Sequence, residues 1–167
     1  MNKIIDITVD SEMTNLISDL QRLIRQPSVS AKNQGIIQCA SLVASIMNKA
    51  GIHTEILYLD QNVNDNGHHN NDANVPPIVY GEVKSKANPN GKTILFYNHY
   101  DVQPEDPIEL WDEEPFSGKV KGNFIFGRGA ADDKGELITR IKAVEYFLKK
   151  QVTYLVMQSL LWKERKR

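Results

Sequence analysis

The feature that most constrains the fold is a short apolar run, residues 93–97, that leads directly into a polar segment, residues 98–104. An apolar run of this length, bounded by polar and turn residues, predicts a buried strand of an α/β sheet. Further along, a glycine-rich segment, residues 127–135, leads into a helical pattern. Because ligands of such sheets bind at the carboxyl ends of the strands, we expect the functional site where residues 98–104 leave the sheet.

Imidazole and carboxylate side chains in these two segments are candidates for metal binding. His99 and Asp101 are two residues apart, so on extended backbone their side chains point in the same direction. Zinc takes both imidazole and carboxylate ligands, and a carboxylate can instead hold the far nitrogen of a ligating imidazole. Asp132 and Asp133 follow the glycine-rich turn, a common place to present a carboxylate. Each residue by itself also fits a structural role, as a hydrogen-bonded histidine or part of a simple turn.

In order and spacing, the two segments resemble the motifs of metallopeptidase family 20, which groups aminoacylases, dipeptidases, carnosinase-like enzymes and acetylornithine or succinyl-diaminopimelate deacylases. The family patterns G-H-x-D-x-x-P and G-R-G-x-x-D-x-K-G correspond to N-H-Y-D-V-Q-P at 98–104 and G-R-G-A-A-D-D-K-G at 127–135. Trp111 and Phe116 match the family's W-x-x-x-P-F segment, and the D-V-Q-P and D-D-K-G spellings look most like the dipeptidase and carnosinase-like branch. Asn98 stands where the family usually has glycine, a departure that removes no ligand.

The resemblance implies a fold, a cofactor and roles for individual residues. The fold would be an α/β/α sandwich of the zinc-peptidase (phosphorylase/hydrolase-like) type, with residues 1–150 forming the N-terminal part of the catalytic domain. His99 would ligate one zinc ion, Asp132 would bridge two, and Asp101 would act as a catalytic residue that orients His99. Cobalt and manganese are alternatives to zinc. The implied activity is hydrolysis of amide bonds in dipeptides or N-acyl amino acids, and complete relatives are homodimers.

Composition narrows the class of protein further. The 167 residues, 41% of them hydrophobic and 25% charged, suffice for one domain with a real core. The formal net charge of -1 creates no field that favours nucleic acid or an acidic membrane. No segment is long enough to span a bilayer, the N-terminus lacks a signal-peptide pattern, and the single cysteine, Cys39, cannot form an internal disulfide. We therefore expect a cytoplasmic location, with neither a nucleic-acid nor a membrane partner.

Hydrophobic periodicity predicts the remaining elements. Helices are expected over residues 11–25, over residues 34–50 and from Lys134 onward, whereas residues 1–10 show no clear pattern. Strands are expected at residues 52–59, 78–83, 119–121 and 123–126. A turn at residues 88–91 is expected to join the strands at 78–83 and 93–97 as a hairpin. The polar run at 61–75, which contains His68 and His69, is interpreted as a solvated loop in preference to a metal-binding tract.

The last segment, residues 151–167, contains no glycine and ends in a basic cluster. One interpretation is a helix or a frayed tail, and a basic tail that touches a membrane or nucleic acid is a weaker one. A third is an aberrant tail produced by a frameshift near Gln151. Codons can be chosen for Leu155 to Arg167 whose shifted frame encodes C-N-A-K-F-I-V-E-G-E-E-E, the strand and glutamates that relatives carry at this place.

The frameshift interpretation has a consequence for activity. In the family, a glutamate acts as the general base, and further ligands, including a late histidine, come from sequence that is not in this chain, as does the lid or dimerisation domain. We therefore expect the chain to be truncated and inactive as written. One alternative is a non-catalytic fragment or pseudoenzyme with weak metal binding. Another is a magnesium-dependent phosphotransferase that uses Asp132 and Asp133, although the sequence contains no phosphate-binding loop.

Overall fold

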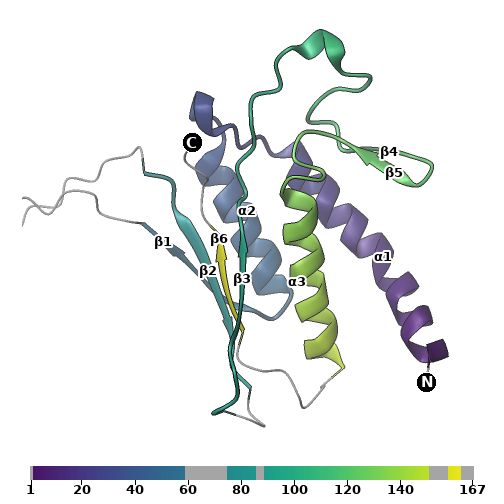
Figure 1. Cartoon of the computed structure of the whole chain (residues 1–167), viewed down its shortest axis with the longest axis vertical. Coiled ribbons are helices and arrows are strands. Elements are labelled where there is room, and N and C mark those ends of the chain that lie inside the picture. The colour runs from purple at the N-terminus through teal and green to yellow at the C-terminus, as the bar shows by residue number, and fades with distance from the viewer. Residues whose placement is uncertain (1, 59–74, 86–88, 151–157, 163–167) are drawn as a thin grey trace, which may run out of the picture.

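The computed structural model of the chain describes residues 2–58, 75–85, 89–150 and 158–162 (Figure 1). The main elements follow in the order α1 (Asn2–Arg25), α2 (Ile36–Lys49), β1 (His53–Leu57), β2 (Ile78–Val83), β3 (Ile94–Asn98), β4 (Lys119–Lys121), β5 (Phe124–Phe126), α3 (Lys134–Lys149) and β6 (Gln158–Trp162). Apart from the differences given below, these bounds confirm the predicted helices and strands. Most of the polar run at 61–75, including both of its histidines, lies outside the described residues. Within the residues that are described, no helix is both long and apolar enough to cross a membrane.

The main sheet has four strands in the order β1-β2-β6-β3. The pairs β1–β2 and β2–β6 are antiparallel, whereas β6 and β3 are parallel. The predicted hairpin between β2 and β3 is therefore wrong, because β6 lies between them and pairs with both. The same strand shows that residues 158–162 are not helical, contrary to one interpretation of the tail. β4 and β5 form a separate two-stranded sheet.

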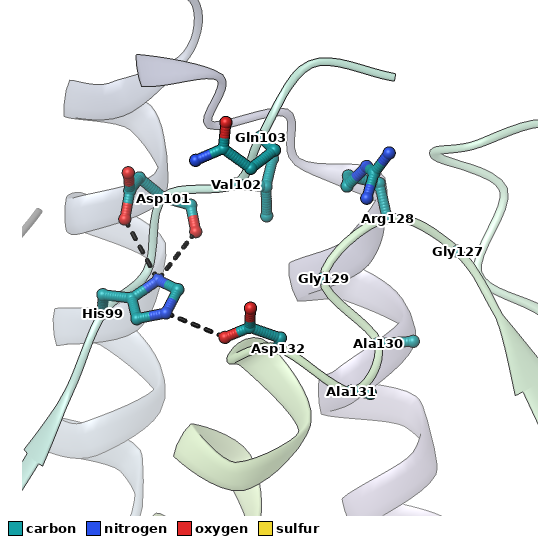
Figure 2. Close-up of a pocket in the computed structure, with 10 residues that line it drawn as sticks. All are labelled: His99, Asp101, Val102, Gln103, Gly127, Arg128, Gly129, Ala130, Ala131 and Asp132. Carbon is teal, nitrogen blue, oxygen red and sulfur yellow. Dashed lines mark hydrogen bonds and ion pairs between the residues drawn. The ribbon is translucent and has the colours of Figure 1, made fainter. Parts of the chain in front are cut away.

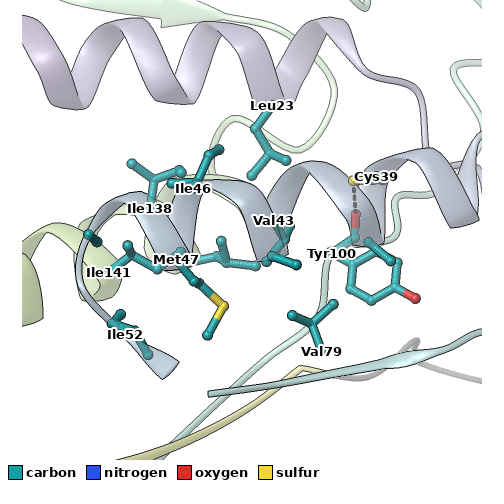
Figure 3. Packing of buried hydrophobic residues seen from close by; sticks show 14 of the residues in the cluster. Leu23, Cys39, Val43, Ile46, Met47, Ile52, Val79, Tyr100, Ile138 and Ile141 are labelled. Carbon is teal, nitrogen blue, oxygen red and sulfur yellow. Dashed lines mark hydrogen bonds between the residues drawn. The ribbon is translucent and has the colours of Figure 1, made fainter. Parts of the chain in front are cut away.

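The three helices lie on the same side of the main sheet, as Figure 1 shows. Helix α2 packs on β1 and β2, α3 packs on β3, and α1 crosses over both helices. In Figure 3, side chains of α2 lie between Leu23 of α1 and the strand residue Val79, with Ile138 and Ile141 of α3 closing the same cluster. Cys39 is fully buried in this core, in agreement with a structural role. The observed helices and strands confirm the α/β fold class.

Helix α1 begins at Asn2, nine residues before the predicted start. The sequence shows no apolar pattern before Ser11, so the helix was expected to begin at that residue. Once a helix is nucleated, each further residue adds a hydrogen bond at little cost, and residues 2–10 contain neither proline nor glycine. The packed part of α1, which includes Leu20, Leu23 and Ile24, therefore suffices to extend the helix backward.

Strand β3 is less buried than its apolar sequence predicts. Ile94, Leu95 and Tyr97 are each at least half exposed, at 51%, 60% and 53%. β3 is an edge strand of the described sheet, and the described helices cover only one of the sheet's faces. The prediction holds at the carboxyl end, where Asn98 is buried.

Candidate metal centre

His99 follows β3 directly, and Asp101 holds its imidazole from one side (Figure 2). The His99 Nδ1 atom lies 3.1 Å from Asp101 Oδ1 and 3.1 Å from the backbone oxygen of the same residue. With a proton on Nδ1, this nitrogen donates to Asp101, and Nε2 is turned toward the open side of the site. Asp101 is 2% exposed, so the orienting carboxylate is itself fixed by its surroundings. The predicted convergence of the two side chains is observed.

The segment that carries His99 is anchored to two other parts of the chain, at Ser28 and at Pro77. The Ser28 hydroxyl donates to the Tyr100 carbonyl at 2.7 Å, and the Val102 amide donates to the Ser28 carbonyl at 2.8 Å. On the opposite side, the buried Tyr100 hydroxyl donates to the Pro77 carbonyl at 2.6 Å. Buried polar groups that are paired in this way rigidify their surroundings. The segment that carries His99 is therefore pre-organised.

Asp132 reaches the same site from the glycine-rich loop before α3. Its Oδ1 atom lies 3.0 Å from His99 Nε2, and its side chain is 80% exposed. Gly129 shapes this loop with a φ of +83°, and an added Cβ would lie 2.7 Å from a methyl group of Val102. Only glycine combines this backbone conformation with so close an approach. The structure thus brings His99, Asp101 and Asp132 together.

Lys134 fixes the other end of the loop and was not singled out from the sequence. Its side chain is fully buried, and Nζ donates to the carbonyls of Leu23 at 2.9 Å and Gln26 at 2.7 Å, at the C-terminal end of α1. Burial lowers the pKa of the Lys134 ammonium. The same ammonium pairs with carbonyl oxygens at the end of α1 that have no partner within the helix. The lysine of the D-D-K-G motif was the one sequence signal for this buried contact. A lysine next to two aspartates, however, predicts a surface ion pair equally well.

Asp133, which the sequence offered only as a second candidate carboxylate, instead forms hydrogen bonds within the protein. Its Oδ2 atom accepts a hydrogen bond from Asn98 Nδ2 at 2.7 Å and another from the His99 backbone amide at 3.1 Å. Asn98 and Asp133 are 1% and 9% exposed. The departure at Asn98 therefore has a structural partner, which no local pattern in the sequence could reveal.

The electrostatics of the metal-free site favour a charged imidazole. The hydrogen bond to Asp101 is the main cause that raises the pKa of His99 to about 9, and the negative charge of Asp133 acts in the same direction. A proton on Nε2 is then shared with Asp132. A metal ion must displace the proton on Nε2. Metal binding at this pair therefore releases a proton when the pH is below the pKa of His99.

A cavity of about 230 Å³ opens in front of these groups and is lined by both loops, including Gln103 and Arg128. The Arg128 guanidinium lies 4.8 Å from the centre of the Trp111 ring, a cation–π distance. The Trp111 indole nitrogen donates to the Glu105 carbonyl at 2.8 Å. Trp111 therefore packs the loop after the site and also holds Arg128 at the cavity wall.

The distance between the two candidate ligand atoms fits a zinc ion. Atoms bound to one tetrahedral zinc at about 2.0–2.2 Å lie roughly 3.3–3.5 Å apart. His99 Nε2 and Asp132 Oδ1, at 3.0 Å, need to separate by only a few tenths of an ångström, which the exposed Asp132 side chain allows. Among the residues that the structure describes, no group of three or more His, Cys, Asp or Glu side chains is arranged to hold a metal. The described part of the chain thus offers two candidate ligands and the residues that support them.

The carboxyl end of β3 thus presents an imidazole and a carboxylate, two side-chain types that bind zinc, where ligands of α/β sheets usually bind. Comparison with known protein families identifies one family that this chain resembles. The profile of peptidase family M20/M25/M40 matches residues 95–157, which include His99, Asp101 and Asp132. The resemblance to metallopeptidase family 20 is thereby confirmed.

Curated relatives extend the similarity over most of the chain. The sequence is 37% identical over 145 residues to the Cys-Gly metallodipeptidase dug1 of Schizosaccharomyces pombe, covering 82% of this chain and 28% of that protein. It is 33% identical over 140 residues to the succinyl-diaminopimelate desuccinylase of Blochmanniella pennsylvanica, covering 83% of this chain and 32% of that protein. The chain therefore spans about a third or less of the length of these relatives.

Solved structures show the same relationship. A family M20 metallo-carboxypeptidase from Sulfolobus solfataricus superposes with a TM-score of 0.72 at 32% identity, covering 89% of this chain and 30% of the other. The dipeptidase Dug1p from Saccharomyces cerevisiae gives a TM-score of 0.76 at 25% identity, with coverages of 93% and 33%. Human carnosine dipeptidase 1, at 21% identity and a TM-score of 0.76, supports the fold.

Proposed function

We propose that this chain contributes part of the active site of a zinc-dependent hydrolase that cleaves amide bonds in dipeptides or N-acyl amino acids. The observation that carries the proposal is the 3.0 Å separation of His99 Nε2 and Asp132 Oδ1 in a cavity, with Asp101 on the other imidazole nitrogen. Similarity to a dipeptidase and to a desuccinylase supports this substrate class. Cobalt and manganese remain alternatives to zinc, and residues 1–150 would form the N-terminal part of the catalytic domain.

Each of the three residues has a distinct role in this proposal. His99 would hold zinc through Nε2, and Asp132 would hold it through its carboxylate, which the family resemblance implies is shared with a second zinc. Asp101 keeps a proton on Nδ1 of His99, so that the lone pair of Nε2 faces the metal. When bound, zinc polarises the amide carbonyl and lowers the pKa of water. The low exposure of Asp101 keeps solvent from competing for the Nδ1 proton.

We further propose that turnover requires groups beyond the described residues. Hydrolysis of this kind needs a general base and enough ligands to hold the metal, whereas the described residues bring two ligands together. This observation favours the second candidate function, a non-catalytic fragment with weak metal binding. A homodimer, as in the family's complete members, and a cytoplasmic location, which the buried Cys39 supports, complete the proposal.

Calorimetric titration with zinc, combined with a dipeptide hydrolysis assay, tests the proposed function. His99→Ala should abolish binding at the site, whereas His53→Ala serves as a matched control because His53 is an exposed histidine on β1. Binding that depends on His99, together with turnover, would support the hydrolase. Binding that depends on His99 without turnover would support the non-catalytic fragment. Zinc binding that is absent, or equal in both variants, would contradict the metal centre.

A further inference from the structure

We infer that Asn98 and Asp133 form a positioning clamp that sets the separation of the two candidate metal ligands. The clamp residues are immediate neighbours of the ligands in the chain, Asn98 before His99 and Asp133 after Asp132. Their side chains meet through the Asn98 Nδ2 to Asp133 Oδ2 hydrogen bond of 2.7 Å. The end of β3 and the start of α3 are therefore joined at the point where each presents its ligand. This inference rests on the metal centre in the proposed function.

The position of Asp133 argues against a simple helix-capping role. Asp133 precedes α3 at the N-cap position, where an aspartate normally accepts a hydrogen bond from the first turn of its own helix. No such side-chain hydrogen bond is formed in this helix. The same carboxylate oxygen instead accepts from Asn98 and from the His99 backbone amide, 34 residues away in the chain.

Because Asn98 and Asp133 are buried, loss of their hydrogen bond should have a large effect. Asn98 is 1% exposed and Asp133 is 9% exposed, whereas the neighbouring Asp132 side chain is 80% exposed. A hydrogen bond to a buried carboxylate is stronger than one between neutral groups, and removing one partner leaves the other desolvated and unpaired. Because Asp133 also holds the His99 amide, loss of the clamp moves the imidazole and the Asp132 loop relative to each other. We therefore expect loss of metal affinity as well as loss of stability.

Three variants test the clamp: Asn98→Ala, Asp133→Ala and the conservative Asp133→Asn. Asn98→Ala changes no charge and should weaken zinc binding by about tenfold, the usual effect of losing a group that supports a metal ligand. In Asp133→Asn, the amide oxygen can still accept from both Asn98 and the His99 backbone amide, as one carboxylate oxygen does in the original protein. Zinc affinity should therefore stay within about threefold of the original protein in Asp133→Asn, and should fall by about tenfold in Asp133→Ala. Asn123→Ala, an exposed asparagine in the turn between β4 and β5, is the matched control.

A second measurement reads the clamp without metal. In the metal-free protein, hydrogen exchange of the His99 amide, followed by NMR, should be faster in Asn98→Ala and in Asp133→Ala, and should remain slow in Asp133→Asn. Wild-type protein that binds no zinc, but shows this pattern, would contradict the metal centre and leave the clamp intact. The clamp is overturned if Asn98→Ala lowers the melting temperature alone, with zinc affinity and His99 exchange unchanged. It is also overturned if Asp133→Ala folds and changes neither.

Discussion

The two candidate ligands, His99 and Asp132, are held in opposite ways. The His99 side chain is 16% exposed and is fixed on its far nitrogen by Asp101, whose side chain is 3% exposed. The Asp132 side chain is 80% exposed, and its hydrogen bond to His99 is the interaction that positions its carboxylate. The backbone beneath Asp132 is nevertheless firmly held, because Asp133 and Lys134 on its C-terminal side are both buried.

This difference separates two tasks of a metal site. A rigid imidazole defines where the ion binds, because little conformational entropy remains to be lost there on binding. An exposed carboxylate on a fixed backbone can adjust by a few tenths of an ångström, as a zinc ion between the two atoms requires. The His99 side should therefore contribute to the stability of the fold, whereas the Asp132 carboxylate should contribute to metal binding alone.

The largest effect is expected for Lys134→Met, which removes the support beneath the Asp132 loop. The methionine keeps much of the apolar volume but leaves the buried carbonyls of Leu23 and Gln26 without their donor. The free energy of unfolding should fall by about 3 kcal/mol. Urea denaturation measures the change, and Lys121→Met, at an exposed position on β4, is the control. An unchanged midpoint would show that the loop backbone is held by other contacts.

A smaller loss is expected for Asp101→Ala, which leaves one side of the His99 ring without its carboxylate partner. Because Asp101 is buried, the free energy of unfolding should fall by about 2 kcal/mol in metal-free protein. The pKa of His99, followed by NMR of the ring protons, should fall at the same time, since the hydrogen bond to Asp101 is the main cause of its elevation. A variant that unfolds earlier but keeps the His99 pKa high would contradict the orienting role.

The pH dependence of stability gives a third test of the His99 side. The pKa of His99 is raised from 6.5 to about 9 in the folded protein, so the folded state binds the proton more tightly than the unfolded state. The resulting stabilisation is fully present below pH 6.5 and is lost as the pH rises through 9. We expect a decrease on the order of 1 kcal/mol across this range in metal-free protein, after allowing for solvent screening. Urea titrations at several pH values measure it, and His99→Ala should abolish this part of the dependence.

The smallest effect on stability is expected for Asp132→Ala. Its exposed carboxylate leaves little buried surface or unpaired charge behind, so the free energy of unfolding should change by no more than about 0.5 kcal/mol. Zinc affinity measured by calorimetry should nevertheless fall at least as far as in Asp101→Ala. If Asp132→Ala were as destabilising as Asp101→Ala, the contrast between the two sides of the site would be wrong.

Local sequence patterns were sufficient for most of the fold. Periodicity predicted α2, α3 and β2 because each buries one continuous apolar face. The same reasoning could not order the sheet, since the insertion of β6 between β2 and β3 depends on pairing between distant segments. It also placed β3 in a fully buried environment, because an apolar run does not reveal whether its strand lies at an edge.

The sequence predicted the candidate ligands of the site but not the residues that support them. Spacing identified His99, Asp101 and the two aspartates after the glycine-rich turn as candidates, and the family resemblance selected Asp132. Lys134 and the Asn98–Asp133 pair were missed because their partners lie far away in the chain. Such contacts leave no periodic signal, and a lysine or asparagine in a polar loop predicts solvent exposure as readily as burial.

Anomalous X-ray scattering at the zinc edge, from a crystal of the protein soaked in zinc, tests the central claim most directly. The account predicts one strong peak roughly 2.0–2.2 Å from both His99 Nε2 and Asp132 Oδ1, with Asp101 still bound to Nδ1. A His99→Ala crystal soaked in the same way should lack that peak. A peak at the exposed His53–Glu55 pair on β1, with none between His99 and Asp132, would contradict the account.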